Sequence, residues 1–102
     1  MTVYRNAKCD TYYSEGVEQN VPVQVKIEDG SIAVSYEENG VPVVYEGREI
    51  EPGHFELERR GISSKATLHR FSDDDVLEGS WREERYEGMW RIELREPFKI
   101  SD

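Results

Sequence analysis

Two histidines, His54 and His69, could act together in this chain if the fold brings them side by side. They are the only histidines in 102 residues, and Glu56 follows His54 at a spacing of two, which keeps both side chains on one face of a strand. Two imidazoles and a carboxylate could bind zinc or another divalent metal. Two ordinary surface histidines are the simpler interpretation. We therefore predict no metal site from the sequence. If the chain does bind a metal ion, His54 and His69 are the candidate ligands.

Aromatic side chains with a polar atom form a second set of candidates. Tyr36, Tyr45, Trp81 and Trp90 each combine a large apolar ring with one hydrogen-bonding group, which suits the wall of a small-molecule site. Arg70 could orient an acidic group of such a ligand through a bidentate contact. An arginine paired with a nearby carboxylate is the commoner arrangement, and this chain has many carboxylates. These five residues are the predicted ligand-binding set.

No catalytic set stands out beside them. Ser63, Ser64, His69 and Asp73 are close in sequence, but sequence proximity does not make a catalytic triad. The run from Asp73 to Asp75 lacks the spaced ligands of an EF-hand calcium loop. Cys9 is the only cysteine, and no histidine lies near it in sequence to activate the thiol. An enzyme is therefore the least favoured interpretation, and no cofactor is expected.

The charge balance of the chain argues against two classes of partner. Lys and Arg number 13 against 22 Asp and Glu, which gives a formal net charge of -9. Nucleic acid and anionic membranes both attract basic surfaces, so the sequence predicts neither partner. No apolar run approaches the roughly 20 residues of a membrane span, and the N-terminus lacks the apolar centre of a signal peptide. A cytoplasmic protein is therefore expected.

Alternating apolar residues predict strands from Val21 to Leu94. Asp29-Gly30 and Asn39-Gly40 interrupt the alternation, and both pairs favour two-residue type I′ hairpin turns. Gly61-Ile62 fits a third hairpin turn, with glycine first. The cross-strand pairs that follow from the three turns are Ile27 with Ile32, Val25 with Val34, Val34 with Tyr45, Tyr36 with Val43, Phe55 with Leu68, Leu57 with Ala66 and His54 with His69.

The sequence Glu-Gly-x-Trp occurs twice, at residues 78–81 and 87–90. Either a turn centred on Glu84-Arg85 or a four-residue loop over 83–86 joins the two copies in the same register. In this register Trp81 faces Gly88, Gly79 faces Trp90, Glu78 meets Arg91 and Arg82 meets Glu87. Each indole then covers a residue without a side chain, so we interpret the repeat as hairpin packing and not as a ligand motif.

The predicted strands number seven between Val21 and Arg95, and residues 2–8 could supply an eighth. Residues 9–20 are polar and are expected to form a surface linker, and the first of the seven strands is expected to begin just after Pro22. Short hairpin connections imply neighbouring antiparallel strands. We therefore predict an all-β single domain over residues 1–102, an antiparallel meander that closes into an eight-stranded up-and-down β-barrel. A strongly bent open sheet or a sandwich is the alternative.

The alternation also predicts which side chains turn inward. Four polar residues share this parity and are expected toward the barrel ends: Arg59, Arg70, Glu83 and Tyr86. The apolar residues expected inside are Val23, Val25, Ile27, Ile32, Val34, Tyr36, Val43, Tyr45, Phe55, Leu57, Ala66, Leu68, Leu77, Trp81, Trp90, Ile92 and Leu94. Eight-stranded barrels either fill themselves with such side chains or hold one small ligand.

In strand count and connection, the predicted architecture resembles the lipocalin and avidin-like small barrels. Gly79-Ser80-Trp81 spells the Gly-x-Trp motif that lipocalins carry on their first strand, whereas here it falls on the seventh predicted strand. The resemblance is therefore one of architecture, and what it implies is a ligand inside the barrel.

From these patterns we expect a non-enzymatic barrel that binds a small apolar or aromatic ligand in its interior. The alternative is a filled barrel that acts through its acidic outer surface as a protein-interaction module, or as a homodimer. An enzyme with a site at the barrel mouth comes third. A homodimer would use an outward patch with few charges, made of Pro22, Ala33, Ser35, Pro42 and Val44.

Overall fold

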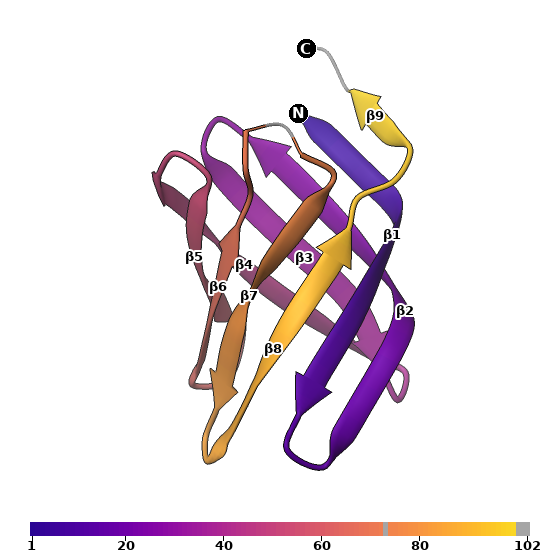
Figure 1. Ribbon diagram of the computed structural model, residues 1–102, viewed down its shortest axis with the longest axis vertical. Helices are drawn as coiled ribbons and strands as arrows, with labels where there is room; N and C mark the ends of the chain where they lie inside the picture. Colours follow the sequence, from indigo (N-terminus) through magenta and orange to yellow (C-terminus); the bar gives the residue numbers. More distant parts are fainter. Residues whose placement is uncertain (73, 100–102) are drawn as a thin grey trace.

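The structure is a computed structural model that describes residues 1–72 and 74–99, and it consists of β-strands joined by short turns (Figure 1). No helix in the described part of the chain is long and apolar enough to cross a membrane. The strands are β1 (Thr2–Tyr13), β2 (Gly16–Glu28), β3 (Ser31–Glu38), β4 (Val41–Glu51), β5 (His54–Arg59), β6 (Ser64–His69), β7 (Val76–Glu83), β8 (Tyr86–Glu93) and β9 (Pro97–Lys99).

The first strand closes the barrel. Strands β2 to β8 each pair with their neighbours in sequence, and β1 pairs with both β2 and β8. This ring confirms the predicted eight-stranded, antiparallel up-and-down barrel. The short β9 pairs with the N-terminal part of β1, beyond the end of β8. Closure leaves no free edge within the ring of eight, so every strand has two neighbours.

The barrel has two ends with different connections. The turns at residues 14–15, 39–40, 60–63 and 84–85 lie at one end, which is the lower end in Figure 1. The upper end carries the turns at 29–30 and 52–53, the connection from β6 to β7 and the N-terminus. We call the lower end the mouth.

The predicted hairpin registers are confirmed. Asp29 and Gly30 have φ of 46° and 79°, and Asn39 and Gly40 have φ of 54° and 79°, as a type I′ turn requires. The turn at Glu84-Arg85 has two residues, because Glu83 pairs directly with Tyr86, so the alternative four-residue loop is wrong. The confirmed pairs include Ile27 with Ile32, Val34 with Tyr45, Phe55 with Leu68, Trp81 with Gly88 and Gly79 with Trp90.

The predicted surface linker over residues 9–20 is wrong. β1 continues to Tyr13 and β2 begins at Gly16, so these residues form a long hairpin. Its pairing shifts between Cys9 and Thr11, where Asn20 adopts a φ of 59°. A bulge breaks the alternation of side chains, and the hairpin end is exposed on both faces. The period-two signal is therefore missing from the sequence.

Pro22 lies inside strand β2, just before the residues at which β2 begins to pair with β3. The expected strand start just after Pro22 is wrong, because Pro22 lies within β2 and pairs with Lys8 of β1. The ladder between β2 and β3 begins only at Gln24 and Ser35. Proline has no N–H to donate, so β2 bonds to β1 at this level before it also bonds to β3.

The interior is filled by side chains from all eight strands of the ring. Val25, Val34, Leu68, Leu77 and Ile92 have no exposed surface. β1 contributes four buried residues that the predicted interior did not include: Val3, Tyr4, Ala7 and Cys9. Val3 and Tyr4 are adjacent and both buried, and the register shifts between Tyr4 and Ala7, so the alternation that identified the other inward residues is broken in β1. Three predicted interior residues, Ile27, Tyr36 and Trp81, are only partly buried and pack against this core.

Candidate functional site

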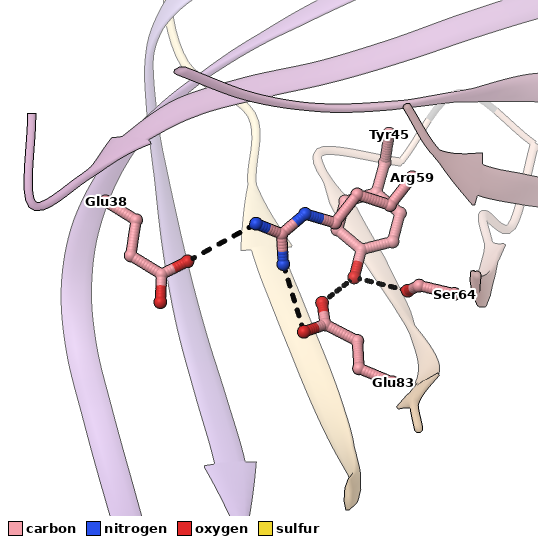
Figure 2. A network of polar contacts seen from close by, with 5 residues as sticks. All are labelled: Glu38, Tyr45, Arg59, Ser64 and Glu83. Carbon is pink, nitrogen blue, oxygen red and sulfur yellow. Dashed lines mark hydrogen bonds and ion pairs between the residues drawn. The ribbon is translucent and has the colours of Figure 1, made fainter. Parts of the chain in front are cut away.

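Five side chains at the mouth form a connected polar network, which we call the mouth network (Figure 2). They come from five different strands, β3 to β7, and enclose one end of the barrel interior. The alternation of each strand turns them inward, and the hairpin registers bring them to the same level. The members are Glu38, Tyr45, Arg59, Ser64 and Glu83.

The hydroxyl of Tyr45 is the centre of this network. Tyr45 is 2% exposed, and its hydroxyl donates a hydrogen bond to Oε2 of Glu83. The Tyr45 and Ser64 oxygens are 2.9 Å apart. A phenol has one proton, so Ser64 is the donor in that bond. The buried hydroxyl of Ser64 and the phenol therefore form a chain of donors that ends on the carboxylate.

The guanidinium of Arg59 holds the other side of Glu83. Its Nη1 lies 3.0 Å from Oε1 of Glu83, and the two side chains are 20% and 26% exposed. Its Nη2 lies 4.0 Å from Oε2 of Glu38, which is 57% exposed. Both oxygens of Glu83 thus have partners, as a half-buried carboxylate requires. With two carboxylates and one guanidinium, the mouth network carries one net negative charge.

Burial and these carboxylates raise the pKa of two tyrosines, Tyr36 and Tyr45. Burial raises the pKa of Tyr36 to about 12, and the nearby Glu38 and Glu83 add to the rise. Burial also raises the pKa of Tyr45, with a further contribution from its hydrogen bond to Glu83. Both phenols therefore remain neutral donors through the physiological range.

Trp90 uses its polar atom within the core. It is 4% exposed, its ring meets that of Tyr45 edge-on with centroids 5.2 Å apart, and its Nε1 donates to the carbonyl oxygen of Thr67 at 3.0 Å. A Cβ on Gly79 would collide with that carbonyl oxygen. The missing side chain of Gly79 therefore lets the indole reach across β7 to β6.

Trp81 has the same relation to a glycine but a different polar environment. Its ring covers Gly88, whose Cβ would lie 2.6 Å from Cζ2 of the indole. The Nε1 atom of Trp81 is buried, and it has no hydrogen-bond partner among the described residues. The residue as a whole is partly exposed and packs against the core. An unpaired buried donor of this kind requires an explanation.

Arg70 is not brought together with the predicted aromatic residues. It follows β6 at the upper end, where its Nε donates to the carbonyl oxygen of Asp74 at 2.7 Å. Arg59 lies beside Tyr45 instead, because these two residues pair across β4 and β5. The inward parity of Arg59 and Glu83 was visible in the sequence, but the β4–β5 register was not. Tyr86, of the same parity, is 62% exposed.

The two histidines lie side by side on the outer face. His54 pairs with His69, and their ring centroids are 4.1 Å apart at an interplanar angle of 80°. Glu56 pairs with Thr67, two residues along the strands from the His54–His69 pair. Within the described residues, no group of three or more His, Cys, Asp or Glu side chains is arranged to hold a metal ion. The predicted register is thus confirmed.

The candidate catalytic residues are separated. Ser64 begins β6 at the mouth, whereas His69 ends the same strand at the upper end and faces outward. Asp73 lies outside the described residues. The thiol of Cys9 is buried, and this burial raises its pKa to about 11, so it carries little thiolate at neutral pH. Among the described residues, Ser64, His69 and Cys9 therefore do not form a nucleophile and base pair.

The outer face of β4 to β8 is hollowed into a groove of about 940 Å³. Residues of five strands line it, with Ile50 and Met89 as exposed apolar members, Thr67 and Ser80 between them, and Trp81 also part of the lining. Two smaller pockets of about 380 and 430 Å³ also open on the outside. None of these three pockets is formed by the Tyr45 and Trp90 rings in the interior.

Comparison of the chain with models of protein families, with curated proteins and with solved structures gives no match. The chemistry of its own residues is therefore what supports a function.

Proposed function

We propose that this is a non-enzymatic binding protein of the cytosol that takes a small neutral molecule at the mouth of its barrel. The ligand would have an aromatic or apolar body and one hydrogen-bond acceptor, which receives the N–H of Trp81. The observation that carries this proposal is the buried Nε1 of Trp81, which has no acceptor among the described residues.

The two tryptophans show why this atom is informative. Both indoles lie across a glycine, yet only Trp90 is given an acceptor, at Thr67. A buried donor without an acceptor costs about 1–3 kcal/mol. A ligand that supplies the acceptor at Trp81 recovers this free energy, and Tyr36 and Trp81 offer it partly exposed aromatic surface.

The mouth is a better position for this ligand than the middle of the barrel expected from the sequence. In the middle, Tyr45 and Trp90 pack against each other and are 2% and 4% exposed, which leaves little volume between them. At the mouth, Tyr36 and Trp81 are partly exposed. The proposal therefore keeps Tyr36, Tyr45, Trp81 and Trp90 together but assigns Arg70 no role.

The charge of the mouth selects against anionic ligands. Arg59 is already paired with Glu83 at 3.0 Å, and Glu38 adds a second carboxylate. The whole chain carries a formal charge of -9. An anion would approach against this field, so a neutral molecule is favoured over an acid with the same body.

The first experiment compares native and denatured masses of freshly purified protein and then titrates two probes by calorimetry. The probes are 2-naphthol and naphthalene-2-sulfonate, which share one apolar body and differ in charge. We expect 2-naphthol to bind with one molecule per chain and at least about tenfold more tightly than the sulfonate, because about 1.4 kcal/mol of repulsion gives that factor.

Trp81→Phe tests the donor and Trp90→Phe is its matched control. The first variant keeps an aromatic ring and removes the unpaired N–H, so it should retain stability and lose affinity for 2-naphthol. The second leaves the Thr67 oxygen unpaired and should destabilise the fold by about 1–3 kcal/mol. Absence of any bound mass together with unchanged probe binding in Trp81→Phe would contradict the proposal.

The outer surface supports self-association as a second candidate function. One outward row is uncharged across five strands, and its exposed apolar members Met89, Tyr12 and Val17 are 59%, 43% and 47% exposed. These three residues pair in succession across β8, β1 and β2. Such an apolar strip with charged flanks is typical of an interface. The whole row consists of Thr67, Ser80, Met89, Tyr12 and Val17.

The charges beside this strip fit a second copy of the chain. On β7, Arg82 and Glu78 flank Ser80, and on β8, Glu87 and Arg91 flank Met89 in the opposite order of charge. A copy rotated by a half turn about an axis along the strip would place Arg82 opposite Glu78 and Glu87 opposite Arg91. This complementarity favours the strip over the patch expected from the sequence.

Sedimentation velocity distinguishes the two candidates. We expect a concentration-dependent dimer that Met89→Asp abolishes, and Val41→Asp is the matched control because both side chains are 59% exposed. A chain that remains monomeric at millimolar concentration would exclude self-association and leave ligand binding as the function.

A further inference from the structure

The histidine pair lies away from the mouth network, at the upper part of the outer face, and its role is independent of the proposed function. His54 begins β5 and His69 ends β6. They pair across the two strands, and their ring centroids are 4.1 Å apart. We propose that His54 and His69 form a two-imidazole binding site for a divalent transition-metal ion.

The position of the two rings suits simultaneous binding. Side chains directly opposite on antiparallel strands have Cβ atoms about 4.5–5.5 Å apart, and metal–nitrogen bonds of about 2.0–2.1 Å require the two nitrogens to lie close together. The chain has only two histidines, and the fold places both at this one point. His54 is partly exposed and His69 is exposed, so an ion in solution can reach both rings.

The surroundings of His69 fix which nitrogen faces the ion. Its Nδ1 lies 3.4 Å from the carbonyl oxygen of Glu78, at the long end of hydrogen-bonding distance. A proton on Nδ1 directed to that carbonyl leaves the lone pair of Nε2 available. Metal-bound histidines commonly donate their other N–H to a backbone carbonyl in this way.

Two carboxylates extend the histidine row. Glu51 pairs with His54, and Glu78 pairs with His69, so the outward order across four strands is Glu51, His54, His69 and Glu78. Glu78 is also 3.9 Å from the Nε of Arg91. In the described residues these side chains are not arranged as a group of three ligands. The site is therefore one of two imidazoles, with water in its remaining positions and Glu51 able to approach by side-chain rotation.

Because both ligands are imidazole nitrogens, the site should prefer one class of metal ion. It suits nickel, copper and zinc, whereas magnesium and calcium prefer oxygen ligands. Because the acidic chain attracts every cation weakly, Mg²⁺ at equal concentration separates this general attraction from binding at the histidines.

The test uses the full chain without a histidine tag, titrated with Ni²⁺ or Zn²⁺ by calorimetry and in thermal unfolding. We expect one Ni²⁺ per chain and a melting temperature that rises with Ni²⁺ concentration, as binding to the folded state requires, with no comparable rise in Mg²⁺. His54→Gln and His69→Gln should each weaken Ni²⁺ binding by about tenfold or more. Glu51→Gln should weaken it less than either histidine variant.

Two results would overturn the site. One is the absence of saturable Ni²⁺ binding at millimolar concentration. The other is binding that stays unchanged in both histidine variants, which would place the ion on surface carboxylates or the terminal amine. Binding of 2-naphthol at the mouth should be the same in His54→Gln and in the parent chain, so failure of one proposal leaves the other standing.

Discussion

At the level of single residues, the protonated phenol of Tyr36 contributes to stability. The pKa of Tyr36 is raised from 10.0 to about 12 by burial, with Glu38 and Glu83 adding to the shift. The folded chain therefore holds this proton more tightly than the unfolded chain. That contribution is fully present below pH 10 and is lost as the pH rises toward 12. A shift of about two units corresponds to roughly 2–3 kcal/mol at most.

Tyr36→Phe should therefore flatten the alkaline loss of stability. We expect the free energy of unfolding of the variant to fall less steeply between about pH 10 and pH 12 than that of the parent chain. Urea unfolding at a series of pH values, followed by tryptophan fluorescence, measures the difference. Exposed Tyr86 provides the control, and a Tyr86→Phe variant should follow the parent. Identical profiles for Tyr36→Phe and the parent would refute the assignment.

At the level of strands, glycine determines how closely neighbouring strands approach. A Cβ on Gly79 would collide with the Thr67 carbonyl oxygen, which is the acceptor of the Trp90 indole. Gly79→Ala should destabilise the fold by about 2–4 kcal/mol, through overpacking and the lost hydrogen bond. Gly61→Ala is the control, because a Cβ there has open space and only a φ of +90° to accommodate, at about 1–2 kcal/mol.

Chemical denaturation gives both values, and the fluorescence of the folded state reports on Trp90. If Gly79→Ala costs no more than Gly61→Ala, then the carbonyl of Thr67 moves freely and the close approach has no structural role. A red shift of emission in Gly79→Ala but not in Gly61→Ala would instead show that the buried indole has lost its place beside Thr67.

The sequence predicts those strands whose turns carry their own geometry. Asp29-Gly30 and Asn39-Gly40 determine their turn type, and the register of each hairpin follows by counting. The two glycine-tryptophan pairs determine the last hairpin in the same way. Residues 2–8 were predicted as a strand, but the continuation of β1 to Tyr13 and the β4–β5 pairing escape prediction because both contain register shifts. A bulge shifts the pairing of two strands by one residue, and no distinctive local sequence marks where this shift occurs.

The unpredicted register also explains why only part of the candidate site could be predicted from the sequence. Tyr36, Tyr45 and Trp81 were predictable because strand parity turns them inward. Arg59 and not Arg70 lies beside Tyr45 because Tyr45 pairs with Arg59, and this pairing depends on the β4–β5 register, which the sequence did not predict. The unpaired Nε1 of Trp81 has no sequence signal at all, because it depends on the absence of an acceptor in three dimensions.

At the level of the whole molecule, Cys9 reports whether the barrel stays closed. It is the only cysteine, it is 4% exposed, and it pairs with Val21 of β2 and Ile92 of β8. The thiol thus lies on the strand that closes the ring. Burial raises its pKa from 9.0 to about 11, which lowers the thiolate fraction about a hundredfold at pH 8.

Labelling with iodoacetamide, followed by intact mass, therefore measures opening of the barrel. In a closed barrel the reagent reaches Cys9 only after strands separate, so we expect protection to approach the full unfolding free energy, of order 5–15 kcal/mol. A sheet open between β1 and β8 would expose the thiol, and labelling would be slowed only by the lower thiolate fraction. The rate in concentrated urea provides the reference. Protection that increases with 2-naphthol would further connect closure to the mouth, because a ligand that binds only the folded state suppresses opening in proportion to its occupancy.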